Sequence, residues 1–316
     1  MTKPNRLVKV IIGFALYVVT APLQANLIEQ DVELATCHLH IHKTNATIDN
    51  HGPLFVMIEG VPLSALIYRK LALSLADNMS AQSILIDFPG VGKSFLKGES
   101  YTWSDHRQCI KSYLLTLPPH IVMTSDLSTP VVAPLMRQSV PIRGMIISNG
   151  VIKPSIAEPP FPMSFFRCCP QAALNASTWI PNAVLRNRIK EIGIGREATA
   201  DHAEIDTLAK EMDVNGYTGL ANIMPGFTLD AAADMEVSEA LTTTLPLLYL
   251  WGTLDPVLGE HYKYLPALQA NQQLVLYPQA SHYPMLDHHR EMARDIEIWY
   301  KKQFVIEMNA YNASEK

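Results

Sequence analysis

The chain has 316 residues, of which 48% are hydrophobic and 17% charged, and this composition suits a globular protein with a sizeable core. Its formal net charge is −5. Because the chain has no basic block and no interleaving of basic and aromatic residues, we exclude nucleic acid as a partner.

The first 25 residues have the pattern of a secretory signal peptide. Three basic residues, the last of them Lys9, precede an apolar run over residues 10–21, and Ala25 offers a small residue at the cleavage point. The run is shorter than the roughly 20 apolar residues that span a bilayer, so an uncleaved anchor is the weaker interpretation. We therefore predict cleavage after Ala25 and a secreted or periplasmic protein, with no stable membrane insertion once the signal is removed.

Short apolar runs alternate with longer segments of helical periodicity along most of the remaining chain. This alternation predicts a mostly parallel sheet with helices on both faces. The predicted strands cover residues 32–42, 54–58, 83–86, 120–124, 144–148, 245–251 and 273–277. The predicted helices cover residues 63–77, 103–117, 127–137, 260–269 and 287–304.

Residues 153–244 interrupt this alternation. They carry several helical segments rich in Ala, Met, Phe and Pro, but no strong strand pattern. An insertion at the carboxyl end of a strand lies over the place where parallel sheets bind ligands. We therefore predict a signal peptide at 1–25, a first core part at 26–152, a helical cap at 153–244 and a second core part at 245–316.

The segment 121–130 places an acidic side chain at a predicted strand-to-helix turn. Its apolar run ends in Asp126, with the small residues Thr124 and Ser128 two positions to either side. Such a turn projects its side chain out of the fold. An ionised carboxylate in that place is a nucleophile that needs no activating base. Asp126 is therefore the candidate nucleophile, and its alternative role is that of a helix N-cap.

Ser125 and Ser128 are rival nucleophiles in the same turn. The neighbours Met123 and Leu127 are too large for Ser125 to take the elbow position, and a proline two residues further on makes Ser128 unsuitable. Both serines fit the turn less well than Asp126.

Three further turns lie after predicted strands. Glu59 begins a turn that could aim the backbone N–H of Val61 at a developing oxyanion. Asp255 lies just past a later strand, and His282 lies in the loop before the final helix. The chain order is therefore nucleophile, acid and base, with Asp126 first.

With these residues, the sequence resembles the α/β-hydrolase family over about residues 50–304, in the aspartate-nucleophile subgroup of epoxide hydrolases and haloalkane dehalogenases. Residues 86–94 are similar to the family's D-x-P-G-x-G-x-S loop, and 125–130 resemble its H-D-x-G-G-P elbow. Residues 251–256 and 281–285 resemble its acid and base loops. The resemblance implies an α/β-hydrolase fold, with a mostly parallel central sheet flanked by helices and a helical cap inserted after the sixth strand.

The resemblance also implies a two-step hydrolysis. Asp126 would attack an electrophilic carbon to form an ester, and His282, oriented by Asp255, would activate the water that hydrolyses this ester. Backbone N–H groups of Val61 and Leu127 would form the oxyanion hole. We expect an epoxide-hydrolase-like enzyme that acts on a small apolar electrophile and needs neither a cofactor nor a metal ion.

Several positions depart from the family pattern. Thr124, Ser128 and Thr129 stand where the elbow commonly has glycine. Pro134 interrupts the helix that follows. Leu127 stands where haloalkane dehalogenases have a halide-binding Trp, and Val61 stands at their halide-binding Asn. The alternatives are therefore a haloalkane dehalogenase- or esterase-like hydrolase, or a catalytically silent binding protein.

Five side chains are predicted to line the substrate pocket. Met224 occupies the position that matches a cap tyrosine of epoxide hydrolases, so nearby Tyr217 is the substitute proton donor for an epoxide oxygen. Phe165 and Phe166 lie where the other cap tyrosine is expected. Glu59 replaces the usual His of the H-G-x-P turn, and its charge would raise the pKa of the nucleophile unless the side chain turns away.

Three histidines, His38, His40 and His42, alternate along a predicted strand and share one face. Because no carboxylate or cysteine at ligand spacing completes a metal site, we interpret them as part of an exposed strand face.

The spacing of the cysteines matches no zinc pattern. A disulfide framework and free thiols both stay open, as does the oligomeric state. The four residues are Cys37, Cys109, Cys168 and Cys169.

Overall fold

The computed structural model describes residues 26–44, 52–98, 101–161, 163–177, 184, 187, 189–194, 206–208 and 217–305. The predicted signal peptide and parts of the predicted cap lie outside the described residues. Within the described residues, no helix is long and apolar enough to cross a membrane.

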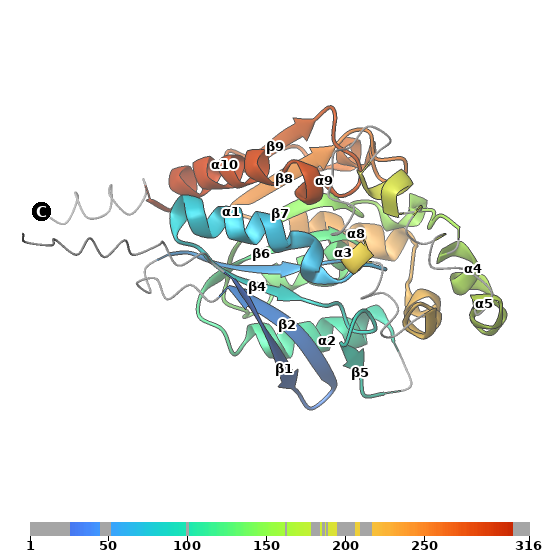
Figure 1. Cartoon of the computed structure of the whole chain (residues 1–316). Helices are drawn as coiled ribbons and strands as arrows, with labels where there is room; N and C mark the ends of the chain where they lie inside the picture. The colour runs from blue at the N-terminus through green and yellow to red at the C-terminus, as the bar shows by residue number, and fades with distance from the viewer. Residues whose placement is uncertain are drawn as a thin grey trace, which may run out of the picture.

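A nine-stranded sheet forms the centre of the molecule (Figure 1). Its order is β1-β2-β4-β3-β6-β7-β8-β9, with the short β5 paired to β2. The six strands from β4 to β9 in this order are parallel, whereas β1, β2 and β5 pair antiparallel. The bounds are β1 (Leu27–Glu33), β2 (Cys37–Thr44), β3 (Leu54–Ile58), β4 (Gln82–Ile86), β5 (Phe95–Leu96), β6 (His120–Asp126), β7 (Ile142–Gly150), β8 (Leu247–Gly252) and β9 (Gln272–Tyr277).

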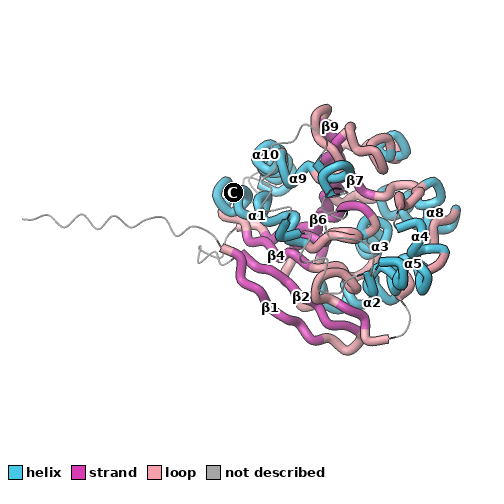
Figure 2. Tube along the Cα trace, turned by 45° about the vertical axis from the view of Figure 1, so that its right-hand side comes forward, coloured by secondary structure: helices cyan, strands magenta, loops and turns pink. Residues whose placement is uncertain are grey.

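Helices cover both faces of the sheet (Figures 1 and 2), which explains why the central strands are continuous apolar runs. One apolar cluster joins α1 and α10 to the sheet, and a second joins α2, α3 and α8 to the opposite face. The bounds of these helices are α1 (Arg69–Met79), α2 (Trp103–Leu114), α3 (Ser128–Val132), α8 (Ala231–Leu241) and α10 (His289–Tyr300). Shorter helices are η1 (Ala65–Tyr68), η2 (Ala133–Arg137), η6 (His261–Tyr264), α9 (Pro284–Asp287) and η7 (Lys301–Val305).

The prediction of one strand over 32–42 is wrong, because this segment spans a hairpin. The N–H of Leu34 donates to the carbonyl of Cys37 at 2.9 Å and closes the turn between β1 and β2. Residues 34–36 contain none of the Gly, Pro, Asn or Asp residues that normally mark a turn. The alternation of apolar and polar residues therefore continues through the turn, and the sequence predicts one strand instead of two.

Two prolines shorten predicted helices. The helix predicted over 127–137 divides into α3 and η2, because Pro134 lacks the N–H that an α-helix needs. The helix predicted over 260–269 is only the 3₁₀ turn η6, since Pro266 favours an extended backbone at Leu265.

The described part of the segment between β7 and β8 contains helices and no strand. It follows the sixth strand of the main path, because β5 lies off that path. Figure 1 places α4 and α5 beyond the carboxyl ends of the parallel strands. The bounds are η3 (Pro154–Ile156), α4 (Met163–Cys168), α5 (Pro170–Ser177), η4 (Ile189–Ile194), η5 (Met224–Gly226) and the helix α8 given above.

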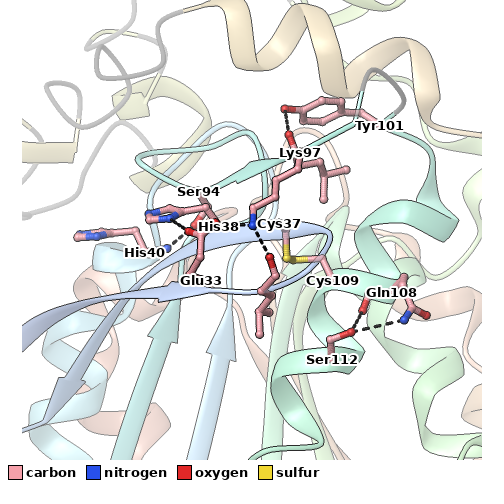
Figure 3. The surroundings of a disulfide bond; sticks show 12 residues. Glu33, Cys37, His38, His40, Ser94, Lys97, Tyr101, Gln108, Cys109 and Ser112 are labelled. Carbon is pink, nitrogen blue, oxygen red and sulfur yellow. Dashed lines mark hydrogen bonds and ion pairs between the residues drawn. A yellow bond between two sulfur atoms is a disulfide. The ribbon is translucent and has the colours of Figure 1, made fainter.

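A disulfide resolves part of the open cysteine pairing. Cys37 of β2 bonds to Cys109 of α2, with their Cα atoms 5.8 Å apart (Figure 3). A capping box at Thr102 and Asp105 fixes the start of α2 and hence the position of Cys109. Cys168 and Cys169 are exposed and free of disulfides.

Candidate active site

Asp126 lies at the turn between β6 and α3 with a φ of 46°. This left-handed conformation costs a residue with a side chain about 1–3 kcal/mol, and Asp is among the few residues that tolerate it. The cap position of α3 is Leu127, which makes no side-chain capping bond. Asp126 is therefore not the N-cap of α3, and its alternative role is ruled out.

The rival nucleophile Ser128 is part of the scaffold beneath the elbow. Its Oγ shares its one proton between the carbonyl oxygens of Ile58 and Ser125, at 2.8 and 2.7 Å, and accepts the N–H of Ser125 at 3.2 Å. The hydroxyl of Ser125 accepts from that of Tyr68 at 2.9 Å. Both serines are buried, and neither lines the cavity described below.

One glycine on a neighbouring strand and one in a neighbouring turn make room for an elbow that is poor in glycine. A Cβ at Gly150 would lie 2.3 Å from the hydroxyl of Thr129, so the glycine on β7 compensates for the threonine in the elbow. A Cβ at Gly60 would lie 2.7 Å from Cβ of Asp126 and 2.9 Å from the N atom of Leu127. The turn that carries Val61 therefore packs directly on the elbow.

The three residues predicted as a triad meet at the carboxyl ends of three parallel strands. Nδ1 of His282 lies 2.7 Å from Oδ2 of Asp255, within hydrogen-bond distance. Nε2 of His282 lies 3.6 Å from Oδ2 of Asp126. The imidazole therefore stands between the two carboxylates, with one nitrogen toward each.

Asn149, which the sequence analysis missed, holds Asp255 in place. Its Nδ2 donates to Oδ2 of Asp255 at 2.8 Å, and its Oδ1 accepts the N–H of Gly252 at 2.8 Å. The N–H of Val257 donates to the other carboxylate oxygen at 2.7 Å. Asn149 has a φ of 42° at the end of β7, and the pair Asn149-Gly150 at a strand end was the available signal.

The charges of the site set the protonation of His282. Burial alone would lower its pKa, but the negative charges of Asp255 and Asp126 together raise it well above the usual value. Burial would raise the pKa of Asp255, yet the charge of His282 and several hydrogen bonds lower it. An imidazolium between two carboxylates is the resulting ground state.

The side chain of Glu59 lies behind the elbow rather than in the cavity wall, so its predicted place in the pocket is wrong. It is 1% exposed. Its pKa is raised to about 7, chiefly by burial and also by the nearby charge of Asp126, while the Ser125 hydroxyl opposes the rise. Glu59 therefore changes charge near neutral pH, inside the protein.

An apolar cavity of about 870 Å³, its open mouth included, lies over Asp126 and His282. Met224 and the two predicted oxyanion residues line it. The described wall consists of Val61, Pro62, Leu63, Asp126, Leu127, Val151, Ala157, Glu158, Pro159, Pro160, Phe161, Met163, Ile192, Leu220, Met224, Val257, Leu258, His282 and Tyr283.

Three more predicted pocket residues lie outside this wall. Phe166 is buried and stacks on Tyr217, with ring centroids 5.5 Å apart. Phe165 packs against the apolar core of the same region. None of these three side chains is in the described wall of this cavity, and the rings of Phe166 and Tyr217 contact each other instead.

Tyr283 brings the sole phenol to the described cavity wall. Its ring contacts that of His282, with centroids 4.5 Å apart. Burial and the negative charges of Glu59 and Asp126 raise its pKa well above the usual value. The phenol of Tyr283 therefore keeps its proton at neutral pH.

Comparisons with known proteins agree with this architecture. Residues 55–295 match the alpha/beta hydrolase family, so the chain belongs to that family and is a hydrolase. No curated protein sequence matches the chain.

Solved structures that are similar to the chain share its fold at low identity. A candidate epoxide hydrolase from Pseudomonas aeruginosa is 14% identical with a TM-score of 0.69, over 90% of this chain and 98% of that chain. A thermophilic esterase from Thermogutta terrifontis is 16% identical with a TM-score of 0.64, over 86% and 98%. A haloalkane dehalogenase loop variant from Bradyrhizobium elkanii is 15% identical with a TM-score of 0.62, over 92% and 100%.

Proposed function

We propose that this hydrolase opens small apolar epoxides through a covalent ester on Asp126. The observation that carries the proposal is the carboxylate of Asp126, held at an elbow with a φ of 46° and 3.6 Å from Nε2 of His282. Both residues face a cavity whose described wall is mostly aliphatic, which suits an apolar substrate.

In the first step, a carboxylate oxygen of Asp126 attacks an epoxide carbon and the bond from that carbon to the ring oxygen breaks. Tyr283 gives its phenolic proton to the released oxygen and recovers a proton from the His282 imidazolium. The products are a hydroxyalkyl ester and a neutral imidazole. Tyr283 is thus the proposed proton donor to the epoxide oxygen, in place of Tyr217, which the sequence favoured.

In the second step, Nε2 of His282 takes a proton from water, and the hydroxide attacks the ester carbonyl. The N–H groups of Val61 and Leu127 stabilise the oxyanion. The intermediate collapses by breaking the bond between the acyl carbon and the alkyl oxygen, and the proton of the resulting Asp126 carboxyl passes to the departing alkoxide. The diol is released, the Asp126 carboxylate is restored and His282 is again an imidazolium. Epoxide and water are consumed and one diol is formed.

Ester formation itself prepares His282 for the second step. The charge of Asp126 is among the causes that raise the pKa of His282. Esterification removes that charge, so the pKa of His282 falls when the ester forms. The imidazole thus becomes a base at the stage at which water must be activated.

The same site gives the competing functions less support. Dehalogenation needs a donor for the leaving halide, but Leu127 and Val61, which occupy the two halide-binding positions, have aliphatic side chains. An esterase would normally use a serine nucleophile, whereas Ser125 and Ser128 are bonded within the scaffold. A silent binding protein would not need the hydrogen bond between His282 and Asp255.

We also propose that the chain is secreted or periplasmic. The basic and apolar segments before Ala25 support export. The disulfide between Cys37 and Cys109 supports it independently, because such bonds persist mainly in oxidising compartments.

The decisive experiment is intact-protein mass spectrometry of the His282→Ala variant with styrene oxide, 1-bromobutane and p-nitrophenyl butyrate in separate reactions. We expect one covalent equivalent from styrene oxide, located on Asp126 by peptide mapping. An adduct from 1-bromobutane alone would assign a dehalogenase, and acylation of a serine would assign an esterase. The absence of any adduct, with no turnover by the unmodified enzyme, would indicate a binding protein.

A further inference from the structure

The pairing of β1 with β2 places carboxylates opposite histidines at the antiparallel edge of the sheet. Glu29 pairs with His42, and Asp31 pairs with His40. Because side chains alternate along a strand, these four residues project from one face. Directly opposite residues have Cβ atoms about 4.5–5.5 Å apart, so their side chains can reach a common ligand.

This face is not the exposed strand surface that the sequence suggested. His40 and His42 are each 3% exposed, and their rings meet edge to face with centroids 4.9 Å apart. Nε2 of His42 has no hydrogen-bond partner among the described residues. A buried polar atom of this kind needs a partner, and the lone pair of an imidazole nitrogen is a metal ligand.

The spacing of the donor atoms suits one metal ion. One ligand atom from each of Glu29, His40 and His42 lies within 4.8 Å of the others. Nε2 of His40 and Oε2 of Glu29 are 3.5 Å apart. Zinc lies about 2.0–2.2 Å from such ligands, so tetrahedral donors are roughly 3.4 Å apart. The pair His40 and Glu29 already has this spacing, and His42 needs only a small side-chain shift.

Asp31 orients His40 for metal binding. Its Oδ1 lies 2.7 Å from Nδ1 of His40, so Nδ1 carries the proton and Nε2 presents its lone pair to the cluster. Imidazoles that bind metals usually donate their other N–H to a carboxylate in this way. The cluster therefore has an outer carboxylate as well as three ligands.

Lys93 competes for the same place. Its ammonium lies 3.1 Å from Oε2 of Glu29 and 3.5 Å from Nε2 of His40. The side chain is 42% exposed, so the ammonium can turn into solvent when another cation arrives. The positive charge of Lys93 compensates Glu29 and weakens the binding of a dication.

We propose that Glu29, His40 and His42 form a zinc site, with water as the fourth ligand. Two imidazoles favour a transition metal over magnesium or calcium, which prefer oxygen ligands. The site fastens the edge strand β1 to β2. The strands β4 and β3 separate it from β6 and the catalytic elbow, so its role is structural.

This proposal departs from the expectation that the chain needs no metal ion. Along the chain, no carboxylate or cysteine stands at ligand spacing from these histidines. Glu29 comes instead from the neighbouring strand, through a hairpin that the sequence did not reveal.

The test is isothermal titration calorimetry of the chelator-treated full chain with zinc chloride, followed by thermal unfolding with and without zinc. We expect one zinc ion per chain and a higher unfolding temperature with zinc. Replacement by cobalt should give the visible absorption of a tetrahedral site. His42→Ala should weaken binding by about 100-fold, and Asp31→Asn by about 10–100-fold.

Two further variants keep the test sharp. His120→Ala is the matched control, because His120 is also a buried histidine with an unpartnered Nε2 among the described residues but lies on β6, outside the cluster, and it should not change zinc binding. Lys93→Met should tighten binding by about tenfold, because it removes a repulsive charge.

Three results would overturn the proposal: no stoichiometric zinc binding by the unmodified chain, equal affinity of the chain and His42→Ala, or unchanged affinity of Lys93→Met. The lysine variant also decides the matter if His42→Ala does not fold.

Discussion

The catalytic end and the β1–β2 hairpin both pair imidazoles with carboxylates, but they do so by different means. At the catalytic end, Asp126, Asp255 and His282 come from turns after parallel strands and meet beneath a cavity. In the hairpin, His40 and Asp31 are cross-strand partners within one antiparallel pair. The first arrangement leaves a carboxylate facing a cavity, and the second fixes ligands on a strand face.

This contrast shows that the backbone decides what the same side chains can do. Strand ends permit unusual backbone angles, such as those of Asp126 and Asn149, which aim side chains at a ligand. Strand interiors permit only the regular alternation of side chains. Chemistry is therefore expected at the parallel end and structural bonding at the edge.

The largest effect is expected for Asp126→Ala. Because the proposed nucleophile is lost, turnover of styrene oxide should fall by roughly 10⁴–10⁶-fold. Diol formation measured by chromatography checks this, with circular dichroism to confirm folding. His38→Ala in the hairpin is the control and should keep full turnover. Substantial activity in Asp126→Ala would contradict the proposal that Asp126 is the nucleophile and that chemistry occurs at the ends of the parallel strands.

Removal of the disulfide should affect the hairpin edge and leave the catalytic end intact. Cys37 and Cys109 are separated by 72 positions, and closing a loop of this size stabilises a protein by about 4 kcal/mol in the chain-entropy account. The double variant Cys37→Ser/Cys109→Ser should lose about this much in urea unfolding. Its kcat should not change.

The matched control for this prediction is the pair of exposed cysteines. Cys168→Ser/Cys169→Ser should keep the stability of the unmodified protein, because neither thiol is in a disulfide. Equal losses in the two double variants would contradict the prediction.

Glu59 should make the catalytic end less stable as pH rises. Its folded-state pKa of about 7 lies above the usual 4.5, so the native state binds more protons between these values. Stability is therefore highest below pH 4.5 for this group and falls as pH rises through 7. At 1.36 kcal/mol per pKa unit, the loss is about 3 kcal/mol.

Glu59→Gln should flatten this part of the pH dependence and stabilise the protein at pH 8. Urea unfolding at several pH values measures the free energy of unfolding and hence this pH dependence. Glu260→Gln, at an exposed glutamate, should keep the original slope. An unchanged slope in Glu59→Gln would show that burial of this carboxyl is not the cause.

The smallest effect is expected for Asn149→Ala. It removes the hydrogen bond to Asp255, and a bond to a charged group contributes about 1.5–3 kcal/mol. We expect kcat to fall by about tenfold, with a shift in its lower pH limit because Asp255 orients and charges His282. Asn149→Asp should alter that pH limit more than it alters folding. A change in KM alone would contradict a positioning role.

The parallel part of the fold was predictable because its strands are continuous apolar runs with helical segments between them. The run 54–58 coincides with β3, and the others differ from their strands mainly at the ends. The β1–β2 hairpin was not predictable, because residues 34–36 lack turn residues. The pairing of antiparallel edge strands depends on their register, and local sequence patterns do not specify that register.

The residues of the candidate triad were predictable because each follows a strand, whereas most of the pocket wall was not. Phe166 and Tyr217 have suitable chemistry but stack on each other, outside the described cavity wall. Tyr283 and Asn149 were missed because their roles depend on neighbours distant in the chain.

The sequence by itself determined the α/β-hydrolase fold and the order Asp126, Asp255, His282, because strand periodicity and short turn motifs are local properties. Only the tertiary structure decided that the imidazole stands between two carboxylates, that Glu59 is buried behind them, and that Glu29 meets His40 and His42. Those outcomes depend on register, burial and through-space charge, which arise when distant segments pack together.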